Sequence, residues 1–150
     1  MKPFLLLSIR PERAAADNEY ESFLRFTGLA EDELPLVNLA RGELPDLDLD
    51  EWSGILLGGG PWNASDPPET KSQAQLRSEA SISALLDKVV ARDFPFLGAC
   101  FGIGTLGLHQ GGLVDRGDPS SARRRWAGRA CQRPAAGLPG TAADAPVDRG

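Results

Sequence analysis

The sequence predicts an α/β fold with a mainly parallel sheet flanked by helices. Two observations predict it: short strings of consecutive apolar residues, typical of strands buried on both faces, alternate with longer segments of helical periodicity. The predicted strands span residues 5–9, 34–39, 54–57 and 94–97, and another begins at 113–114.

Three segments between these strands are expected to be helical. In the first, Asp17 or Asn18 is expected to cap the start and Gly28 to end the helix. Its apolar spacing comes from Tyr20, Phe23, Leu24 and Thr27. The second helix spans 72–91 and the third spans 101–108. The second helix has these residues available for its buried face: Leu76, Ile82, Leu85, Leu86 and Val89. Segments 43–51 and 61–70 are expected to be loops.

Composition changes abruptly after residue 114. Segment 115–150 holds seven arginines and four acidic residues, so it is positively charged within a chain of net charge −5. Its only large apolar residues are Trp126, Leu138 and Val147, too few to offset the entropy of ordering it. We expect residues 1–114 to be the N-terminal portion of one domain. Residues 115–150 are expected to be either a disordered tail or non-native sequence introduced by a frameshift.

The remaining composition narrows the class of protein. A net negative charge argues against sequence-independent nucleic-acid binding, and no apolar run approaches the length of a membrane span. Cys100 and Cys131 lie in such different contexts that no disulfide framework is predicted, and Cys131 is expected to be an incidental thiol. We therefore expect a cytoplasmic protein without a signal peptide.

The segment around Cys100 carries the strongest functional signal. An apolar strand meets a turn in which Gly98 and Gly102 lie two positions before and after Cys100, and a helical segment follows at once. This is the spacing of a nucleophile elbow, in which only tiny side chains let a strand reverse sharply into a helix. The helix start favours the thiolate form of the cysteine. Upstream, the strand at 54–57 runs into a glycine turn whose N–H groups could face an oxyanion.

Together these motifs resemble class I glutamine amidotransferases, which have a Gly-x-Cys-x-Gly-x-Gln elbow and an upstream strand ending in a Gly-Pro turn, here Gly60-Pro61. The resemblance covers residues 1–114 and implies a flavodoxin-like sheet whose C-terminal part is missing. The chain departs from the family pattern in three ways. Gly104 stands at the Gln position, Trp62 replaces a glycine common after the Gly-Pro pair, and the pattern stops after Val114.

The resemblance also implies a function. Cys100 would attack the side-chain amide of glutamine and release ammonia through a glutamyl thioester, with the backbone N–H groups of Gly60 and Phe101 stabilising the oxyanion and Gly59 assisting. The ammonia could pass to a synthetase partner domain or subunit. No cofactor or metal is expected. The family's base is a His followed two positions on by Glu, and this chain contains no such pair. We therefore expect this chain to be inactive.

Four alternatives stay open. Cys100 could be a small buried hydrophobe, and the fold could serve as a non-catalytic binding or regulatory module. A DJ-1/PfpI-like cysteine hydrolase would use Glu12, although a solvated acid is the simpler interpretation of that residue. Segment 102–107 matches a dinucleotide fingerprint, but no acidic residue follows at the required place. The only histidine, His109, is expected at the far end of the helix that starts after Cys100, too distant to be its base.

Overall fold

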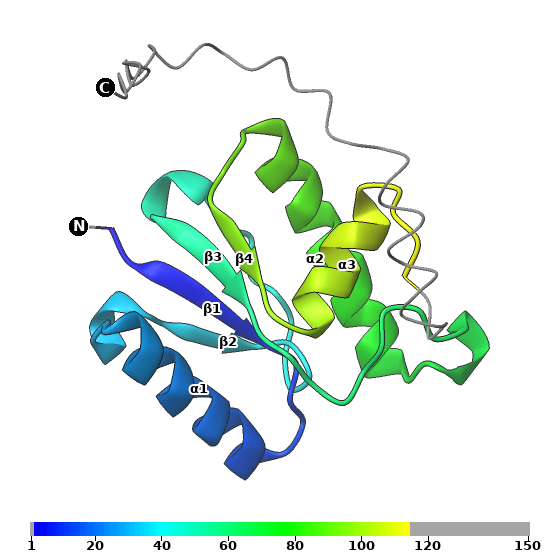
Figure 1. Cartoon of the computed structure of the whole chain (residues 1–150), viewed down its shortest axis with the longest axis horizontal. Helices are drawn as coiled ribbons and strands as arrows, with labels where there is room; N and C mark the ends of the chain where they lie inside the picture. Colours follow the sequence, from blue (N-terminus) through cyan, green and yellow to red (C-terminus); the bar gives the residue numbers. More distant parts are fainter. Residues whose placement is uncertain (1, 115–150) are drawn as a thin grey trace, which may run out of the picture. The chain divides into compact units, whose positions relative to one another are not determined.

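A four-stranded, fully parallel sheet organises the chain (Figure 1). The computed structural model describes residues 2–114; the predicted tail, with Cys131, lies outside the described residues. The strands lie in the order β2-β1-β3-β4. Their bounds are β1 Phe4–Ser8, β2 Leu36–Asn38, β3 Gly54–Leu57 and β4 Phe96–Gly98. The helices are α1 Arg13–Thr27, α2 Gln73–Ala91 and α3 Phe101–His109. The predicted α/β class and parallel sheet are confirmed.

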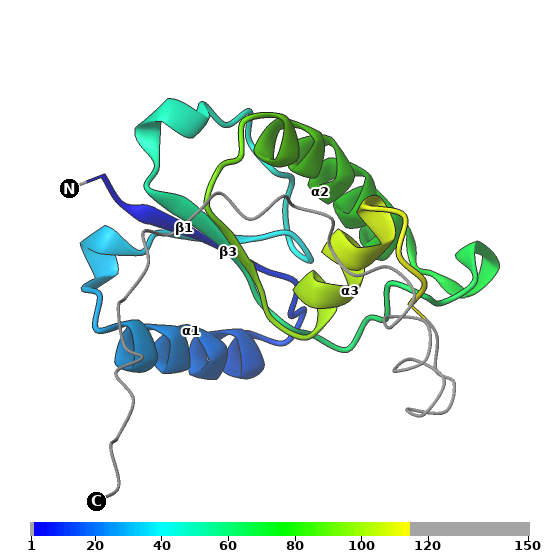
Figure 2. The ribbon, with the colours of Figure 1, turned by 45° about the horizontal axis from the view of Figure 1, so that its top comes forward.

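The sheet carries an apolar core on each face because successive side chains of a strand point to opposite sides. Leu5 and Leu7 of β1 face a core shared with α2 and α3, whereas Leu6 faces a smaller core formed with α1. Figure 2 shows α1 on one side of the sheet and both other helices on the opposite side. Strands buried on both faces are therefore apolar at consecutive positions, as the sequence indicated.

Helix α1 begins earlier than predicted. Its N-cap is Glu12, which makes no side-chain cap, so Asp17 and Asn18 lie within the helix and the predicted cap is wrong. Polar residues at 17 and 18 resemble a helix start, but the Ala-rich segment before them is already a good helix former. The predicted end is confirmed, because Gly28 adopts the left-handed conformation with φ 72° and donates its N–H to the Leu24 carbonyl.

Helix α2 is capped by Ser72, whose Oγ accepts the Gln75 N–H at 3.1 Å. Four of the five predicted core positions are buried, whereas Leu76 is only half-buried. Polar Gln75 and Ser78 are buried near the helix start instead. The Ser78 hydroxyl lies 3.0 Å from the Leu39 carbonyl and 2.8 Å from the Ala74 carbonyl, so this buried polar group has partners.

Strand β4 differs most from its prediction. The sequence predicts a buried strand at 94–97, yet in β4 Phe96 is half-buried and Leu97 is 59% exposed. Within residues 2–114, β4 is an edge strand, and the core that α1 covers includes residues of β1, β2 and β3 but none of β4. The predicted strand start at Leu113 and Val114 is also wrong, since both residues are irregular and Leu113 is exposed. Two apolar residues do not form a strand by themselves, because a strand also needs a neighbouring strand with which to exchange backbone hydrogen bonds.

Candidate site at the strand-to-helix turn

Cys100 occupies the turn between β4 and α3. It is the N-cap of α3 and has φ 53° and ψ −102°, a positive φ that non-glycine residues adopt only at a cost in conformational energy. Its side chain is exposed. A strained, exposed cysteine at this place is the geometry that the glycine spacing predicts. It also excludes the interpretation of Cys100 as a buried hydrophobe.

The two glycines that bracket Cys100 pack backbone against backbone. A Cβ on Gly98 would lie 2.5 Å from the Gly102 carbonyl carbon and 2.9 Å from the Ile103 nitrogen. A Cβ on Gly102 would lie 2.8 Å from the Leu57 carbonyl oxygen in β3. The first turn of α3 therefore presses directly on the ends of β3 and β4. Only residues without a Cβ permit this approach, which is the physical reason for the glycine at each position.

The glycine turn after β3 lies beside the cysteine. A Cβ on Gly59 would be 3.0 Å from Cys100 Cβ and 3.6 Å from its Sγ. Gly60 packs closely on the Ile9 side chain, which a Cβ there would approach to 2.7 Å. The Phe101 side chain is buried at 3% exposure. The structure thus brings Cys100 and Gly59 together although they lie 41 positions apart in the sequence.

Trp62 fills space next to this turn. Its ring meets that of Phe101 edge-to-face, with centroids 6.4 Å apart. The large side chain of Trp62 is therefore accommodated by packing on the first residue of α3.

Glu19 of α1 is the residue that sequence reasoning missed. Its carboxylate accepts the Ser8 hydroxyl at 3.0 Å and the Gly59 N–H at 2.9 Å, and it lies 3.2 Å from Arg10 Nε. Only 10% of its side chain is exposed. One signal could have revealed it: Glu19 lies three residues after buried Ala16, on the apolar face of the helix.

This contact changes the expected role of Gly59. Because its N–H donates to Glu19, that group is engaged inside the protein rather than offered to a ligand. The expectation that Gly59 assists in binding an oxyanion is therefore not met in this structure.

Comparisons with solved structures connect this architecture to known proteins. A glutamine amidotransferase from Methylobacillus flagellatus aligns with a TM-score of 0.52 and 20% identity, over 74% of this chain and 39% of that one. A glutamine amidotransferase from Thermotoga maritima gives the same score and identity, over 74% and 44%. The fold is glutamine amidotransferase-like. This chain spans about two fifths of the length of those two proteins. No protein-family model and no curated protein matches the sequence.

Two other candidate residues lie apart from the turn of this glutamine amidotransferase-like fold. His109 ends α3, where its Nε2 lies 2.8 Å from Asp87 Oδ1 of α2 and its Nδ1 lies 2.7 Å from Gln110 Nε2. Those contacts hold it at the far end of the helix from Cys100, as expected. Glu12 is exposed at the start of α1, so Glu19 rather than Glu12 is the acid near the glycine turn.

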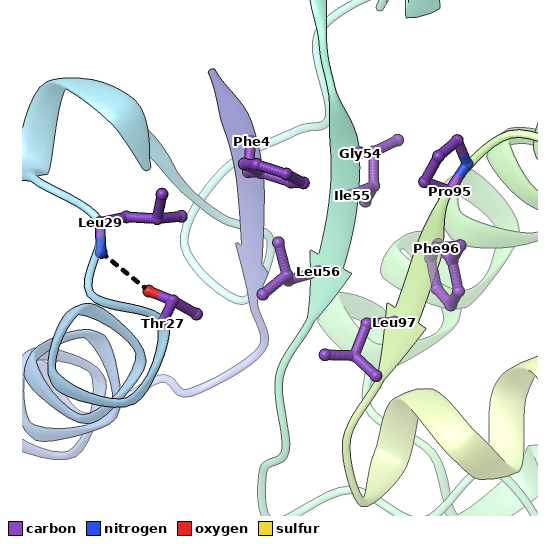
Figure 3. Close-up of a pocket in the computed structure, with 9 residues that line it drawn as sticks. All are labelled: Phe4, Thr27, Leu29, Gly54, Ile55, Leu56, Pro95, Phe96 and Leu97. Atoms are coloured by element: carbon purple, nitrogen blue, oxygen red, sulfur yellow. Dashed lines mark hydrogen bonds between the residues drawn. The ribbon is translucent and has the colours of Figure 1, made fainter. Parts of the chain in front are cut away.

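Two open grooves lie on the surface of residues 2–114. One, of about 420 Å³, is lined by apolar residues that include Phe4, Leu56 and Leu97, and by Thr27 at the end of α1 (Figure 3). The other, of about 430 Å³, runs along α1 and is lined by Arg10 and Glu19. Among residues 2–114 no three His, Cys, Asp or Glu side chains are arranged to hold a metal, and no helix there could span a membrane.

Proposed function

We propose that residues 1–114 are the N-terminal portion of a glutamine amidotransferase domain in which Cys100 is the nucleophile. The observation that carries the proposal is the backbone of Cys100: a positive φ at the start of α3, beside the glycine turn after β3. Strain of this kind persists only where the surrounding structure imposes it, and it places one side chain at the exposed tip of a sharp turn.

The chemistry follows from a nucleophilic sulfur at this position. Cys100 Sγ forms a bond to the amide carbon of the glutamine side chain, and the carbonyl oxygen becomes an oxyanion. When the C–N bond breaks, the nitrogen takes up the proton that the thiol lost and leaves as ammonia, so that a glutamyl thioester remains. Water then attacks the thioester carbon, releasing glutamate and restoring the thiol.

Backbone amides supply the stabilisation of charge in this proposal. Phe101 is the first residue of α3, and the first N–H groups of a helix have no acceptor within it. Gly60 follows the residue that borders Cys100. We assign the oxyanion to the N–H groups of Gly60 and Phe101; removing one such donor from an enzyme typically costs about a hundredfold or more in rate.

The reaction also needs a base, and this sequence offers no suitable one. Its only histidine is engaged with Asp87 at the other end of α3. We therefore propose that the purified chain turns over glutamine negligibly, because the loss of a triad member costs orders of magnitude in kcat. Transfer of ammonia to a synthetase partner belongs to the same proposal.

The test uses a diazoketone analogue of glutamine, in which a diazomethyl ketone replaces the side-chain amide. We expect one covalent adduct by intact mass, lost in Cys100→Ala and slowed by L-glutamine but not by L-asparagine. The matched control is His109→Ala, which should label at the wild-type rate because that ring lies far from the thiol. Labelling that persists in Cys100→Ala, or that glutamine fails to slow, would contradict the proposal.

A non-catalytic binding module is the second candidate, favoured by the engagement of the only histidine away from Cys100. Unlike the amidotransferase proposal, it predicts that the diazoketone forms no adduct at Cys100, with ammonia release at background. Ammonia release that Cys100→Ala abolishes would exclude this candidate.

We also propose that residues 115–150 are non-native sequence produced by a frameshift. The support is the collapse of large apolar residues after Val114 without a linker-like transition. Sequencing the gene tests this: one alternative frame beyond codon 115 should encode apolar strands and a His-x-Glu pair. If neither frame encodes these features, the frameshift proposal is contradicted and residues 115–150 are a genuine tail.

A further inference from the structure

Arg10 is held beside Cys100 by contacts at both its backbone and its side chain. Its carbonyl accepts the Asn38 side-chain N–H at 2.9 Å, which ties it to the end of β2. Its guanidinium Nη2 would lie 3.7 Å from a Cβ on Gly59, the same point that Cys100 Sγ approaches to 3.6 Å. Thiol and guanidinium therefore border one small volume above the glycine turn.

Glu19 fixes the guanidinium without occupying its donors. Glu19 Oε1 lies 3.2 Å from Arg10 Nε, but within residues 2–114 the Arg10 side chain makes no hydrogen bond with proper geometry, and its Nε is buried without one. The carboxylate directs its hydrogen bonds to Ser8 and Gly59 instead. Arg10 is thus positioned by charge and is one third exposed, with the N–H donors of its two Nη atoms available.

The surroundings suit a small anionic ligand. The groove along α1 that Arg10 and Glu19 line has about 430 Å³, within the usual range for small-molecule sites. An arginine that lines such a groove with free Nη donors matches the planar geometry of a carboxylate.

We propose that Arg10 is a specificity-determining residue that binds the α-carboxylate of the substrate while Cys100 attacks the side-chain amide. Glu19 is the positioning residue that holds the guanidinium in place. This inference rests on the proposed function, because in glutamine three carbons separate the α-carboxylate from the amide carbon. That separation suits a thiol and a guanidinium that border the same volume.

A pair of alkylating reagents tests the charge at this site. Iodoacetate and iodoacetamide are nearly the same size, and in each the Cys100 thiolate displaces iodide to form an S–C bond, but only iodoacetate carries a carboxylate. The ratio of the two rates cancels thiol acidity and general access, so it reports the local field. All variants are made in a Cys131→Ser background so that Cys100 is the only thiol.

Arg10→Met should lower the iodoacetate-to-iodoacetamide ratio by about three- to tenfold, the effect of removing one charge several ångströms away. Glu19→Gln should raise the ratio, because Arg10 then loses its neutralising partner while the amide oxygen can still accept from Gly59. The matched control is Arg13→Met, which removes an exposed arginine paired with Asp17 and should leave the ratio unchanged. The shifts should shrink at 1 M salt.

A purely structural role for the pair predicts a different result: both reagents change rate together and the ratio stays constant. Unchanged ratios in both folded variants would overturn the inference, even if the diazoketone labels Cys100. If Arg10→Met does not fold, Glu19→Gln alone decides, since its predicted shift has the opposite sign. If the ratios shift but the diazoketone does not label Cys100, the result supports the anion site and contradicts the amidotransferase proposal.

Discussion

The closest backbone contact at the Cys100 turn gives a quantitative prediction about stability. In Gly98→Ala the new methyl group would lie 2.5 Å from the Gly102 carbonyl carbon and 2.6 Å from its oxygen. Both atoms belong to backbone of α3, so they cannot move aside by rotating a side chain. Gly104→Ala is the matched control, because its methyl would meet only Ala64 Cβ and Val114 Cγ1, each at 3.6 Å.

The two substitutions should change the free energy of unfolding in opposite directions. Overpacking of this kind costs about 1–3 kcal/mol or more, so we expect Gly98→Ala to lose about 2–3 kcal/mol. Gly104 lies inside α3, where alanine is favoured over glycine by about 0.5–1 kcal/mol and no clash opposes the gain. The same chemical change at positions six residues apart therefore has opposite signs.

Urea unfolding followed by tryptophan fluorescence measures both effects. With a slope of about 1–3 kcal/mol per molar urea, Gly98→Ala should lower the midpoint by about 1–2 M, and Gly104→Ala should raise it by a few tenths. A Gly98→Ala protein within about 0.5 kcal/mol of wild type would refute the packing argument, since substitutions without a specific mechanism fall in that range.

Three further predictions concern other parts of the fold. Tyr20→Phe should cost about 1 kcal/mol at neutral pH by removing the hydrogen bond to the Leu34 carbonyl. Burial and, less strongly, Glu31 raise the pKa of Tyr20 above 10.0. The stability of the wild-type protein should therefore fall as the pH rises through the folded-state pKa of Tyr20. Urea midpoints measured across this pH range should fall less in the variant. Lys71→Met should cost about 3 kcal/mol in urea unfolding, because the carboxylate of Glu79, now 2.7 Å from Nζ, would lose its cation and keep only the hydrogen bond from Gln75; a loss below 1 kcal/mol would contradict this. Leu97→Lys should leave the urea midpoint unchanged, because that side chain is largely exposed.

The sequence predicted the elements that depend on local pattern. Consecutive apolar residues in β1 and β3 indicated strands buried on both faces, and Gly28 indicated the end of α1 through its left-handed conformation. The glycines at 98 and 102 indicated the turn that carries Cys100, because their spacing reflects a steric requirement within one short segment. Where the outcome depended on a neighbouring element the prediction was wrong, in the burial of β4 and in the strand expected at Leu113.

Sequence alone therefore determined the class of fold, the order of its elements and the position of the thiol. Only the tertiary structure showed that Glu19 lies between Ser8, Arg10 and Gly59, and that it takes the N–H expected to assist an oxyanion. The reason is physical. The carboxyl ends of the strands of a parallel sheet lie at one edge, so residues distant in sequence meet there. The partners of a charged residue such as Glu19 are therefore set by the residues at that edge and not by the sequence of its own helix.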